Sequence, residues 1–228
     1  YSNGSGPEYI TIVGNLMVDS LFYAREKVTK TSPNPLYTYL GANPEEFALL
    51  TLHRPGNVDE QVQLSELFSI LREVSERIPI IFPIHPRTRD AMERFGLLQH
   101  GKEFSETLSG RGIHFLPPLS YLDFVRHYNA ARFVLTDSGG IQEETTVLDV
   151  PCLTLRENTE RPITVSHGTN TLVGASRADI LEGVEAILSN RGKKAQKIAL
   201  WDGRAGERIA LEIFRILNED ESQPSPKV

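Results

Sequence analysis

Apolar runs alternate with amphipathic stretches along most of the chain. Five short runs are rich in β-branched or aromatic residues, which is typical of strands buried on both faces. They are Tyr9–Val13, Phe47–Leu52, Ile78–Ile84, Phe133–Thr136 and Pro151–Leu155. Elsewhere apolar residues recur three and four positions apart, as in helices that bury one face. The alternation predicts an α/β fold: a Rossmann-like parallel sheet with helices on both faces.

The helical spacing is clearest over residues 64–74, 180–188 and 210–217. The last of these predicts a final helix from about Arg204 to Leu217, which either closes the local core or reaches out to another domain. Residues 98–112 contain three glycines and little apolar periodicity, so we expect a surface loop there. The polar ends predict a flexible lead-in over 1–7 and a disordered tail over 219–228, with one domain over 8–218 between them.

Composition narrows the class of protein. The chain has 228 residues, 39% of them hydrophobic, which suffices for one large buried core. A net charge of -6 disfavours binding to nucleic acid or to an anionic membrane. A single cysteine excludes an internal disulfide framework, and no spacing of ligands suggests a metal site. No apolar run is long enough to span a bilayer and no signal-peptide pattern opens the chain, so we expect a cytoplasmic protein.

Four of the predicted strands run into polar, cationic or glycine-rich turns. These are His53-Arg54-Pro55-Gly56-Asn57, His85-Pro86-Arg87, Asp137-Ser138-Gly139-Gly140 and the stretch from Arg156 to Pro162. The carboxyl ends of parallel strands share one edge of the sheet, which is where open α/β sheets bind their ligands. The histidines and arginines predict that the ligand is anionic, although each could by itself be an ordinary loop residue.

The stretch from Asp137 to Glu144 is the most informative. Ser138 is a favoured N-cap residue, and Gly139 and Gly140 let a phosphate approach the free N–H groups of a helix start. No lysine follows the glycines, so this is not the phosphate loop of an ATPase. Glu143 either stabilises the start of the helix or accepts hydrogen bonds from ribose hydroxyls. Phe124 is either a core residue or a platform for a base.

Together the blocks Thr51–Asn57, Pro83–Pro86, Leu135–Glu144 and Arg156–Pro162 resemble UDP-N-acetylglucosamine 2-epimerases of the non-hydrolysing type, over about residues 14–217. That family has two Rossmann-like domains arranged as in GT-B glycosyltransferases, with the active site between them. The resemblance implies that this chain is the carboxyl-terminal, UDP-binding domain. It also implies that the amino-terminal domain, which carries the acid–base carboxylates, is absent. The first residue, Tyr1 rather than Met, fits that interpretation.

The resemblance implies roles for individual residues. Ser138, Gly139 and Gly140 would bind the diphosphate, Glu143 the ribose and Phe124 the uracil. The remaining candidates are His53 as the one catalytic residue, Arg156 and Arg161 as further lining of the crevice, and Arg54 and His85 as contacts of a second, regulatory UDP-N-acetylglucosamine. The chain departs from many members at two positions: Pro55 replaces a second arginine near the regulatory site, and Ile163 replaces a glutamate near the sugar.

The resemblance further implies the reaction and the partners. The family interconverts UDP-N-acetylglucosamine and UDP-N-acetylmannosamine for polysaccharide biosynthesis, by elimination and re-addition of UDP and without a cofactor. The ligand would be UDP-N-acetylglucosamine or UDP, and the full-length protein would be a homodimer. The fragment alone should bind UDP and be inactive. Two alternatives stay open: a UDP-sugar-dependent glycosyltransferase of GT-B architecture, and a non-catalytic nucleotide-sugar-binding module.

Overall fold

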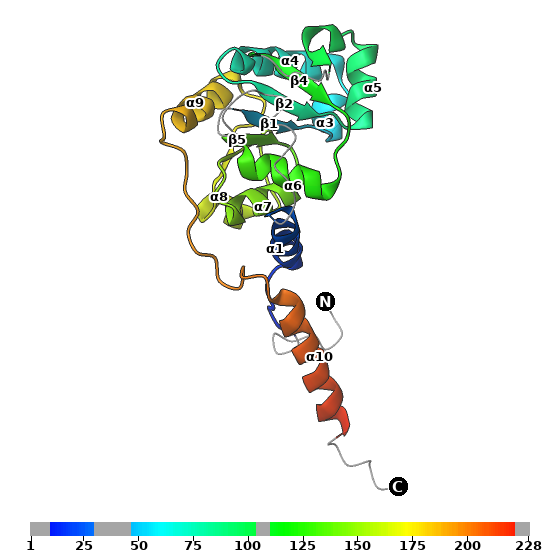
Figure 1. Cartoon of the computed structure of the whole chain (residues 1–228), viewed down its shortest axis with the longest axis vertical. Coiled ribbons are helices and arrows are strands. Elements are labelled where there is room, and N and C mark those ends of the chain that lie inside the picture. The colour runs from blue at the N-terminus through cyan, green and yellow to red at the C-terminus, as the bar shows by residue number, and fades with distance from the viewer. Residues whose placement is uncertain (1–9, 30–46, 104–109, 222–228) are drawn as a thin grey trace.

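A parallel sheet forms the middle layer of the computed structural model, which describes residues 10–29, 47–103 and 110–221 (Figure 1). Its strands lie in the order β3-β4-β2-β1-β5-β6-β7, and each neighbouring pair is parallel. The strands are β1 (Ala48–Thr51), β2 (Ile80–Pro83), β3 (Lys102–Glu103), β4 (Ile113–Leu116), β5 (Phe133–Thr136), β6 (Cys152–Thr154) and β7 (Asn170–Leu172). The predicted α/β Rossmann-like class is confirmed.

Alternation along the central strands divides the apolar side chains between two cores. Successive side chains of a strand point to opposite faces of a sheet. Leu50 and Phe82 accordingly pack in one cluster of buried residues, whereas Leu49 and Ile81 pack in a second cluster. Both faces of the sheet are therefore covered, which explains why these strands are apolar throughout rather than at every second position.

Helices cover both faces of this sheet (Figure 1). The first cluster is closed by α3 (Pro55–Val58), α4 (Gln61–Ser75), α5 (Pro86–Arg94) and α9 (Arg177–Leu188). The second is closed by α1 (Leu16–Thr29), α6 (Tyr121–Ala130) and α7 (Gly139–Val147). A short helix α8 (Pro162–Ser166) precedes β7, and a 3-10 turn η2 (Leu98–His100) precedes β3.

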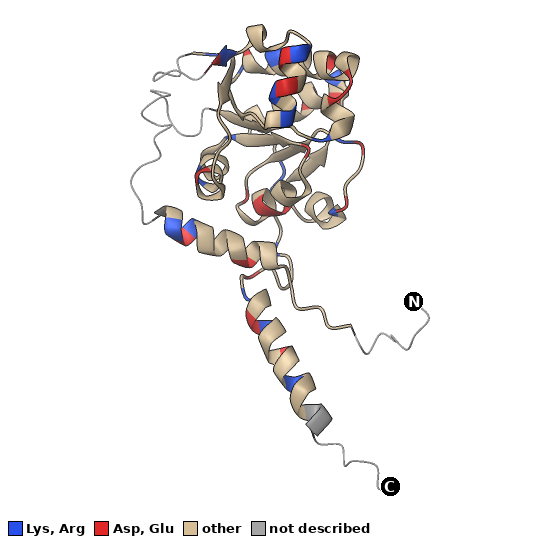
Figure 2. Ribbon diagram, turned by 90° about the vertical axis from the view of Figure 1, so that its right-hand side faces the viewer, with Lys and Arg blue, Asp and Glu red and all other residues tan. Residues whose placement is uncertain are grey.

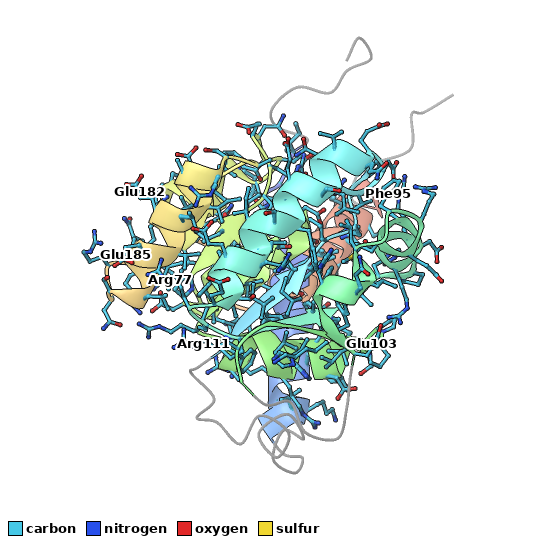
Figure 3. The ribbon with its side chains drawn as sticks, turned by 90° about the horizontal axis from the view of Figure 1, so that it is seen from above. Arg77, Phe95, Glu103, Arg111, Glu182 and Glu185 are labelled. Carbon is cyan, nitrogen blue, oxygen red and sulfur yellow. The ribbon has the colours of Figure 1, made fainter. Side chains whose placement is uncertain are left out.

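Ion pairs on the surface join α4 to α9. Arg77, just after α4, pairs with Glu185 of α9, and the two side chains face each other across the gap between these helices (Figure 3). At the other end of the contact the Arg177 guanidinium donates to both carboxylate oxygens of Glu73, at 2.8 and 3.0 Å. These pairs are exposed, so we assign the stability of this layer mainly to the apolar residues beneath them.

The order of the strands reverses beside β1. From β1 the chain builds β2, β3 and β4 on one side, then crosses back and builds β5, β6 and β7 on the other. The connections that leave β1 and β5 diverge, because α4 packs on one face and α7 on the other. Such a reversal opens a crevice at the carboxyl edge of the sheet.

The strand predictions were partly right. Four of the five predicted runs contain β1, β2, β5 and β6. The prediction for Tyr9–Val13 is wrong where the structure describes it: residues 10–13 have no regular structure, and Ile12 is 79% exposed. They lie along the final helix instead, where the Val13 carbonyl accepts from Arg208 at 3.2 Å. β4 and β7 were not predicted, and the predicted loop 98–112 contains η2 and β3.

The final helix α10 (Ala205–Glu221) projects away from the sheet in two views (Figures 1 and 2). Its first N–H groups, those of Ala205 and Gly206, donate to the Asp19 carboxylate of α1 at 3.1 and 2.7 Å. Beyond this attachment its apolar side chains are exposed, with Phe214 at 69%, so the helix does not close the local core. It runs to Glu221, into the predicted tail; the rest of that tail and residues 1–7 lie outside the described residues. None of the described helices combines the length and hydrophobicity that a membrane span requires.

Candidate functional site

A hollow of about 220 Å³ lies where β1 and β5 end. Four residues singled out from the sequence line it together: His53, His85, Phe124 and Ser138. Its other walls are Thr51, Leu52, Pro83, Pro118, Leu119 and Ile141. A larger hollow, of about 400 Å³, adjoins Arg132 and Pro151 at the amino ends of β5 and β6. Since open α/β sheets bind ligands at the carboxyl edge, we place the site in the smaller one.

His53 is held by a carboxylate that is completely buried. Its Nδ1 lies 3.1 Å from Oδ1 of Asp137, and its backbone N–H also donates to that carboxylate, at 3.0 Å to Oδ2. The backbone N–H of Arg54 donates to the same Oδ2 at 2.8 Å. Burial opposes the charge on Asp137, but these hydrogen bonds outweigh it and hold the pKa of the carboxyl below its usual value. The turn after β1 is thus fastened to the end of β5.

His85 takes the opposite tautomer. It is the N-cap of α5, where its Nδ1 accepts from the backbone N–H of Arg87 at 3.2 Å. A neutral imidazole that accepts at Nδ1 carries its proton on Nε2, whereas His53 donates at Nδ1 and has its Nε2 available. The ring centroids of His53 and His85 are 5.8 Å apart. At Nδ1, His53 therefore donates a hydrogen bond whereas His85 accepts one, and both rings lie beside the same hollow.

The amino end of α7 offers unpaired N–H groups at this edge, because the first turn of a helix has no intrahelical acceptors for them. Ser138 occupies the N-cap, as the sequence predicts, but its hydroxyl makes no capping hydrogen bond. The two glycines differ. A β-carbon on Gly139 would meet nothing closer than 3.9 Å, whereas one on Gly140 would lie 2.7 Å from Cε of Met17. Gly139 leaves room for a ligand, whereas a side chain on Gly140 would displace the end of the Met17 side chain of α1.

Glu143 lies one turn into α7 and is 6% exposed. Its Oε1 accepts from Nδ2 of Asn15 at 3.0 Å, and Nε of Arg161 lies 3.1 Å from the same oxygen. Its Oε2 is buried and makes no hydrogen bond among the described residues. A buried carboxylate oxygen without a donor is costly, and a pair of hydroxyl donors would satisfy it.

The two arginines after β6 have different surroundings. The Arg156 guanidinium donates to both oxygens of Glu160, at 2.8 and 3.0 Å, and to Asn158. This pairing lowers the pKa of Glu160 to about 2. Arg161 instead lies beside Glu143, so it is the one that reaches the α7 side of the crevice. Arg54, the N-cap of α3, is exposed at the rim.

Phe124 is half-buried in α6 and packs edge-on against Tyr128, with ring centroids 5.5 Å apart. Tyr128 and Tyr121 both donate to Glu144 of α7, at 3.0 and 2.8 Å. Burial raises the pKa of Glu144, and these two hydrogen bonds offset the shift only in part. The aromatic wall of the hollow is thereby joined to the helix that carries Glu143.

Three residues of this arrangement were missed as site residues. Asp137 stood inside a recognised motif, but nothing in its spacing shows that it holds His53, which is 84 positions away. Asn57 donates from Nδ2 to Asp137 at 3.3 Å and to the Leu155 carbonyl at 3.0 Å. Asn15 reaches Glu143 from the start of α1. The one sequence signal for Asn15 is that asparagine is a favoured N-cap residue and that it directly precedes the helix over 16–29.

Among the described residues, no group of three or more histidine, cysteine, aspartate or glutamate side chains is placed to hold a metal ion.

Comparison with known proteins places these features in a family. The model of a family described as UDP-N-acetylglucosamine 2-epimerase matches residues 1–213. A Methanocaldococcus jannaschii protein named UDP-N-acetylglucosamine 2-epimerase is 37% identical over 202 residues, covering 88% of this chain and 53% of the relative. A crystal structure of the epimerase from that organism, in complex with UDP-GlcNAc and UDP, superposes with a TM-score of 0.79 at 36% identity and covers 93% of this chain and 56% of the other.

A third relative carries a different sugar in its name. The UDP-2,3-diacetamido-2,3-dideoxy-D-glucuronate 2-epimerase of Pseudomonas aeruginosa is 36% identical over 211 residues, covering 91% of this chain and 53% of the relative. The chain thus spans about half the length of the curated relatives that it matches.

Proposed function

The chain belongs to the UDP-N-acetylglucosamine 2-epimerase family, and we propose from this that it supplies the part of such an enzyme that holds UDP. The whole protein would interconvert UDP-N-acetylglucosamine and UDP-N-acetylmannosamine. The observation that carries the proposal is the hollow at the strand reversal, where His53, Phe124 and Ser138 meet beside the open amino end of α7.

Each part of UDP has a counterpart either in this hollow or in the adjoining first turns of α7. The N–H groups at the start of α7 and the Ser138 hydroxyl suit a diphosphate, because the helix dipole and unpaired donors favour anions there. The half-buried ring of Phe124 suits one face of uracil. Glu143, with one buried oxygen lacking a donor among the described residues, suits the ribose hydroxyls. Arg161, beside Glu143, and Arg54, at the N-cap of α3, add positive charge near these groups.

The proposed reaction begins with loss of the C2 proton and departure of UDP. A base removes the proton from C2, the electron pair forms the C1–C2 double bond, and the bond between C1 and the UDP oxygen breaks. The products are 2-acetamidoglucal and UDP. Re-addition of UDP at C1, with protonation of C2 on the opposite face, gives the epimer. The step needs a site that stabilises negative charge on departing UDP.

His53 is the residue of this chain that we assign to the leaving group. Its Nδ1–H donates to Asp137, so Nε2 is the atom that can carry a proton to the diphosphate. The buried Asp137 carboxylate orients the imidazole at this position, as an aspartate does in other Asp–His pairs. Asp137 acts through His53 and is a positioning residue.

The base and the acid at C2 have no counterpart in the hollow, since none of the described residues that line it is a carboxylate. We expect those groups to come from the part of the family's length that this chain does not span. The 228-residue chain should then bind UDP without turning over sugar nucleotide. Assembly of the whole protein as a homodimer and a regulatory role for Arg54 and His85 stay predictions.

Two features bear on the identity of the sugar. By the family resemblance Ile163 stands where many members have a glutamate, and the Pseudomonas relative is named for a diacetamido glucuronate. The alternative substrate we consider is therefore another UDP-linked 2-acetamido sugar, with the same chemistry at C2.

Deuterium exchange tests the proposed reaction. The full-length protein is incubated with UDP-N-acetylglucosamine in deuterated water, and C2 is followed by NMR. We expect deuterium at C2 together with the manno epimer. Transfer of the sugar to an acceptor without exchange at C2 would instead indicate a glycosyltransferase. Binding with neither exchange nor transfer would indicate a nucleotide-sugar-binding module.

A further inference from the structure

Asn15 joins the start of α1 to the carboxylate proposed to hold the ribose. Its Nδ2 donates to Oε1 of Glu143 at 3.0 Å, across 128 positions of sequence. Its Oδ1 accepts from the backbone N–H of Met17 at 2.9 Å, so Asn15 is the N-cap of α1. Because the oxygen of the amide is engaged with the helix, the amide nitrogen is the end that faces Glu143. Both ends of this side chain are therefore fixed.

The contacts of Glu143 are uneven. Nδ2 of Asn15 donates to Oε1, and Nε of Arg161 lies 3.1 Å from that oxygen without a hydrogen bond, while Oε2 is buried without a hydrogen bond among the described residues. The Arg161 side chain is 42% exposed at the crevice side, whereas Asn15 is tied down at both ends. Asn15 therefore makes the hydrogen bond that fixes how the carboxylate is turned.

We propose that Asn15 is a positioning residue that holds the Glu143 carboxylate in the orientation in which it binds a vicinal diol, and that this makes the site selective for ribonucleotides over deoxyribonucleotides. The inference rests on the proposed function, because the diol is the ribose of UDP. A carboxylate accepts one hydrogen bond from each hydroxyl of a cis-diol. A 2′-deoxy nucleotide lacks one of the two donors, so a rigidly held carboxylate penalises it, as buried polar groups left unpaired do elsewhere.

A purely structural role for Asn15, as the cap of α1, predicts a different response. Aspartate and serine are N-cap residues of about the same quality as asparagine. Asn15→Asp retains the cap but sets a second carboxylate against Glu143. Asn15→Ser retains a cap with a side chain too short to reach Glu143. Each variant weakens a contact of the buried Glu143 under either interpretation, so the melting temperature does not separate the two. A change in the ratio of the UDP affinity to the 2′-deoxy-UDP affinity does separate them.

The experiment is a calorimetric titration of the 228-residue chain with UDP and with 2′-deoxy-UDP. It covers the wild type, Asn15→Asp, Asn15→Ser, Glu143→Gln and the double variant Asn15→Asp/Glu143→Gln. We expect Asn15→Asp and Asn15→Ser to lose about tenfold or more of their affinity for UDP and much less for the deoxy analogue. The double variant should recover part of the loss, because it restores one amide donor and one carboxylate acceptor to the pair, with their positions exchanged.

The outcomes separate this inference from the proposed function. Unchanged ratios of UDP to deoxy-UDP affinity in both single variants of Asn15, with UDP still bound, would overturn the role of Asn15 alone. Absence of any UDP binding by the wild type would overturn both the inference and the proposed UDP site. A collapse of the ratio in both variants, titrated at a temperature at which each is folded, supports the inference.

Discussion

The Nδ1 atom of His53 lies 3.1 Å from Oδ1 of Asp137, a carboxylate with no exposed surface. This contact spans the gap between the ends of β1 and β5, where the order of the strands reverses. It sets the tautomer of His53 and directs Nε2 to the hollow. The same carboxylate accepts from the backbone N–H groups of His53 and Arg54, so one buried group organises the whole turn.

Asp137→Asn should therefore destabilise the fold as well as the site. An amide has one acceptor and would set its own N–H₂ group against donors that now share the carboxylate. Hydrogen bonds to a charged group contribute about 1.5–3 kcal/mol each, and we expect a loss of about 2–4 kcal/mol in the free energy of unfolding. Urea denaturation measures it. His53→Ala, at a side chain that is 38% exposed, is the control and should cost about 1 kcal/mol or less. Equal losses in the two variants would contradict this account.

The Asp137 carboxylate should also make stability depend on pH. Its pKa is lower in the folded chain than the ordinary 3.8, so at pH values between the two the unfolded chain binds more protons than the folded one. The resulting stabilisation is complete above the ordinary pKa of 3.8 and is lost as the pH falls through the folded-state pKa. The loss in the free energy of unfolding that Asp137→Asn causes should thus become smaller in acid. Unfolding curves at about pH 7 and about pH 3 check this, and an identical deficit at both would refute it.

Tyr128→Phe should loosen α6 from α7. The Tyr128 hydroxyl is one of two donors to the buried Glu144, and its loss leaves a carboxylate oxygen without that partner. We expect a cost of about 1–3 kcal/mol in the free energy of unfolding. Tyr121→Phe is the matched control, because it removes the other donor to Glu144 from a residue that is 45% exposed, where water can substitute. A larger cost for the Tyr121 variant would show that burial does not decide the outcome.

Gly139→Ala should weaken the binding of UDP without lowering the stability of the fold. A methyl group at Gly139 meets only ordinary contacts, and alanine is the better helix former, so the melting temperature should stay equal or rise slightly. The methyl group would nevertheless occupy the approach of a phosphate to the start of α7. We expect a loss of about tenfold or more in affinity for UDP, measured by calorimetry. Unchanged affinity would place the diphosphate elsewhere.

The meeting of the turns that carry the candidate residues was predictable, because each turn follows directly after a strand. The turns that begin at His53, His85 and Asp137 meet because the carboxyl ends of parallel strands share an edge. What the sequence does not reveal are contacts made through space, such as Asn15 with Glu143. These depend on how helices from distant parts of the chain pack, and no local spacing records that packing.

The missed strands have a related explanation. β4 includes His114, which is buried and interrupts an apolar run, and its Nε2 is satisfied by the Gly110 carbonyl at 3.0 Å. β7 begins with Asn170, a buried residue whose amide bonds Thr154, Gln142 and Thr164. Polar side chains that are buried with satisfied hydrogen bonds break the hydrophobic pattern without breaking the strand. At residues 10–13 the error was the reverse, because an apolar run was predicted to be a strand and is not one. This run lies along α10 rather than in the sheet.

The most direct test of the central claim is a calorimetric titration of UDP into the 228-residue chain, for the wild type and for Ser138→Ala. The account predicts saturable binding of one UDP by the wild type. It also predicts a loss of about tenfold in affinity for the variant, because a hydroxyl that does not cap α7 is available to the diphosphate. Absence of binding by the wild type, or equal affinity in the two proteins, would contradict the assignment of this hollow as a UDP site.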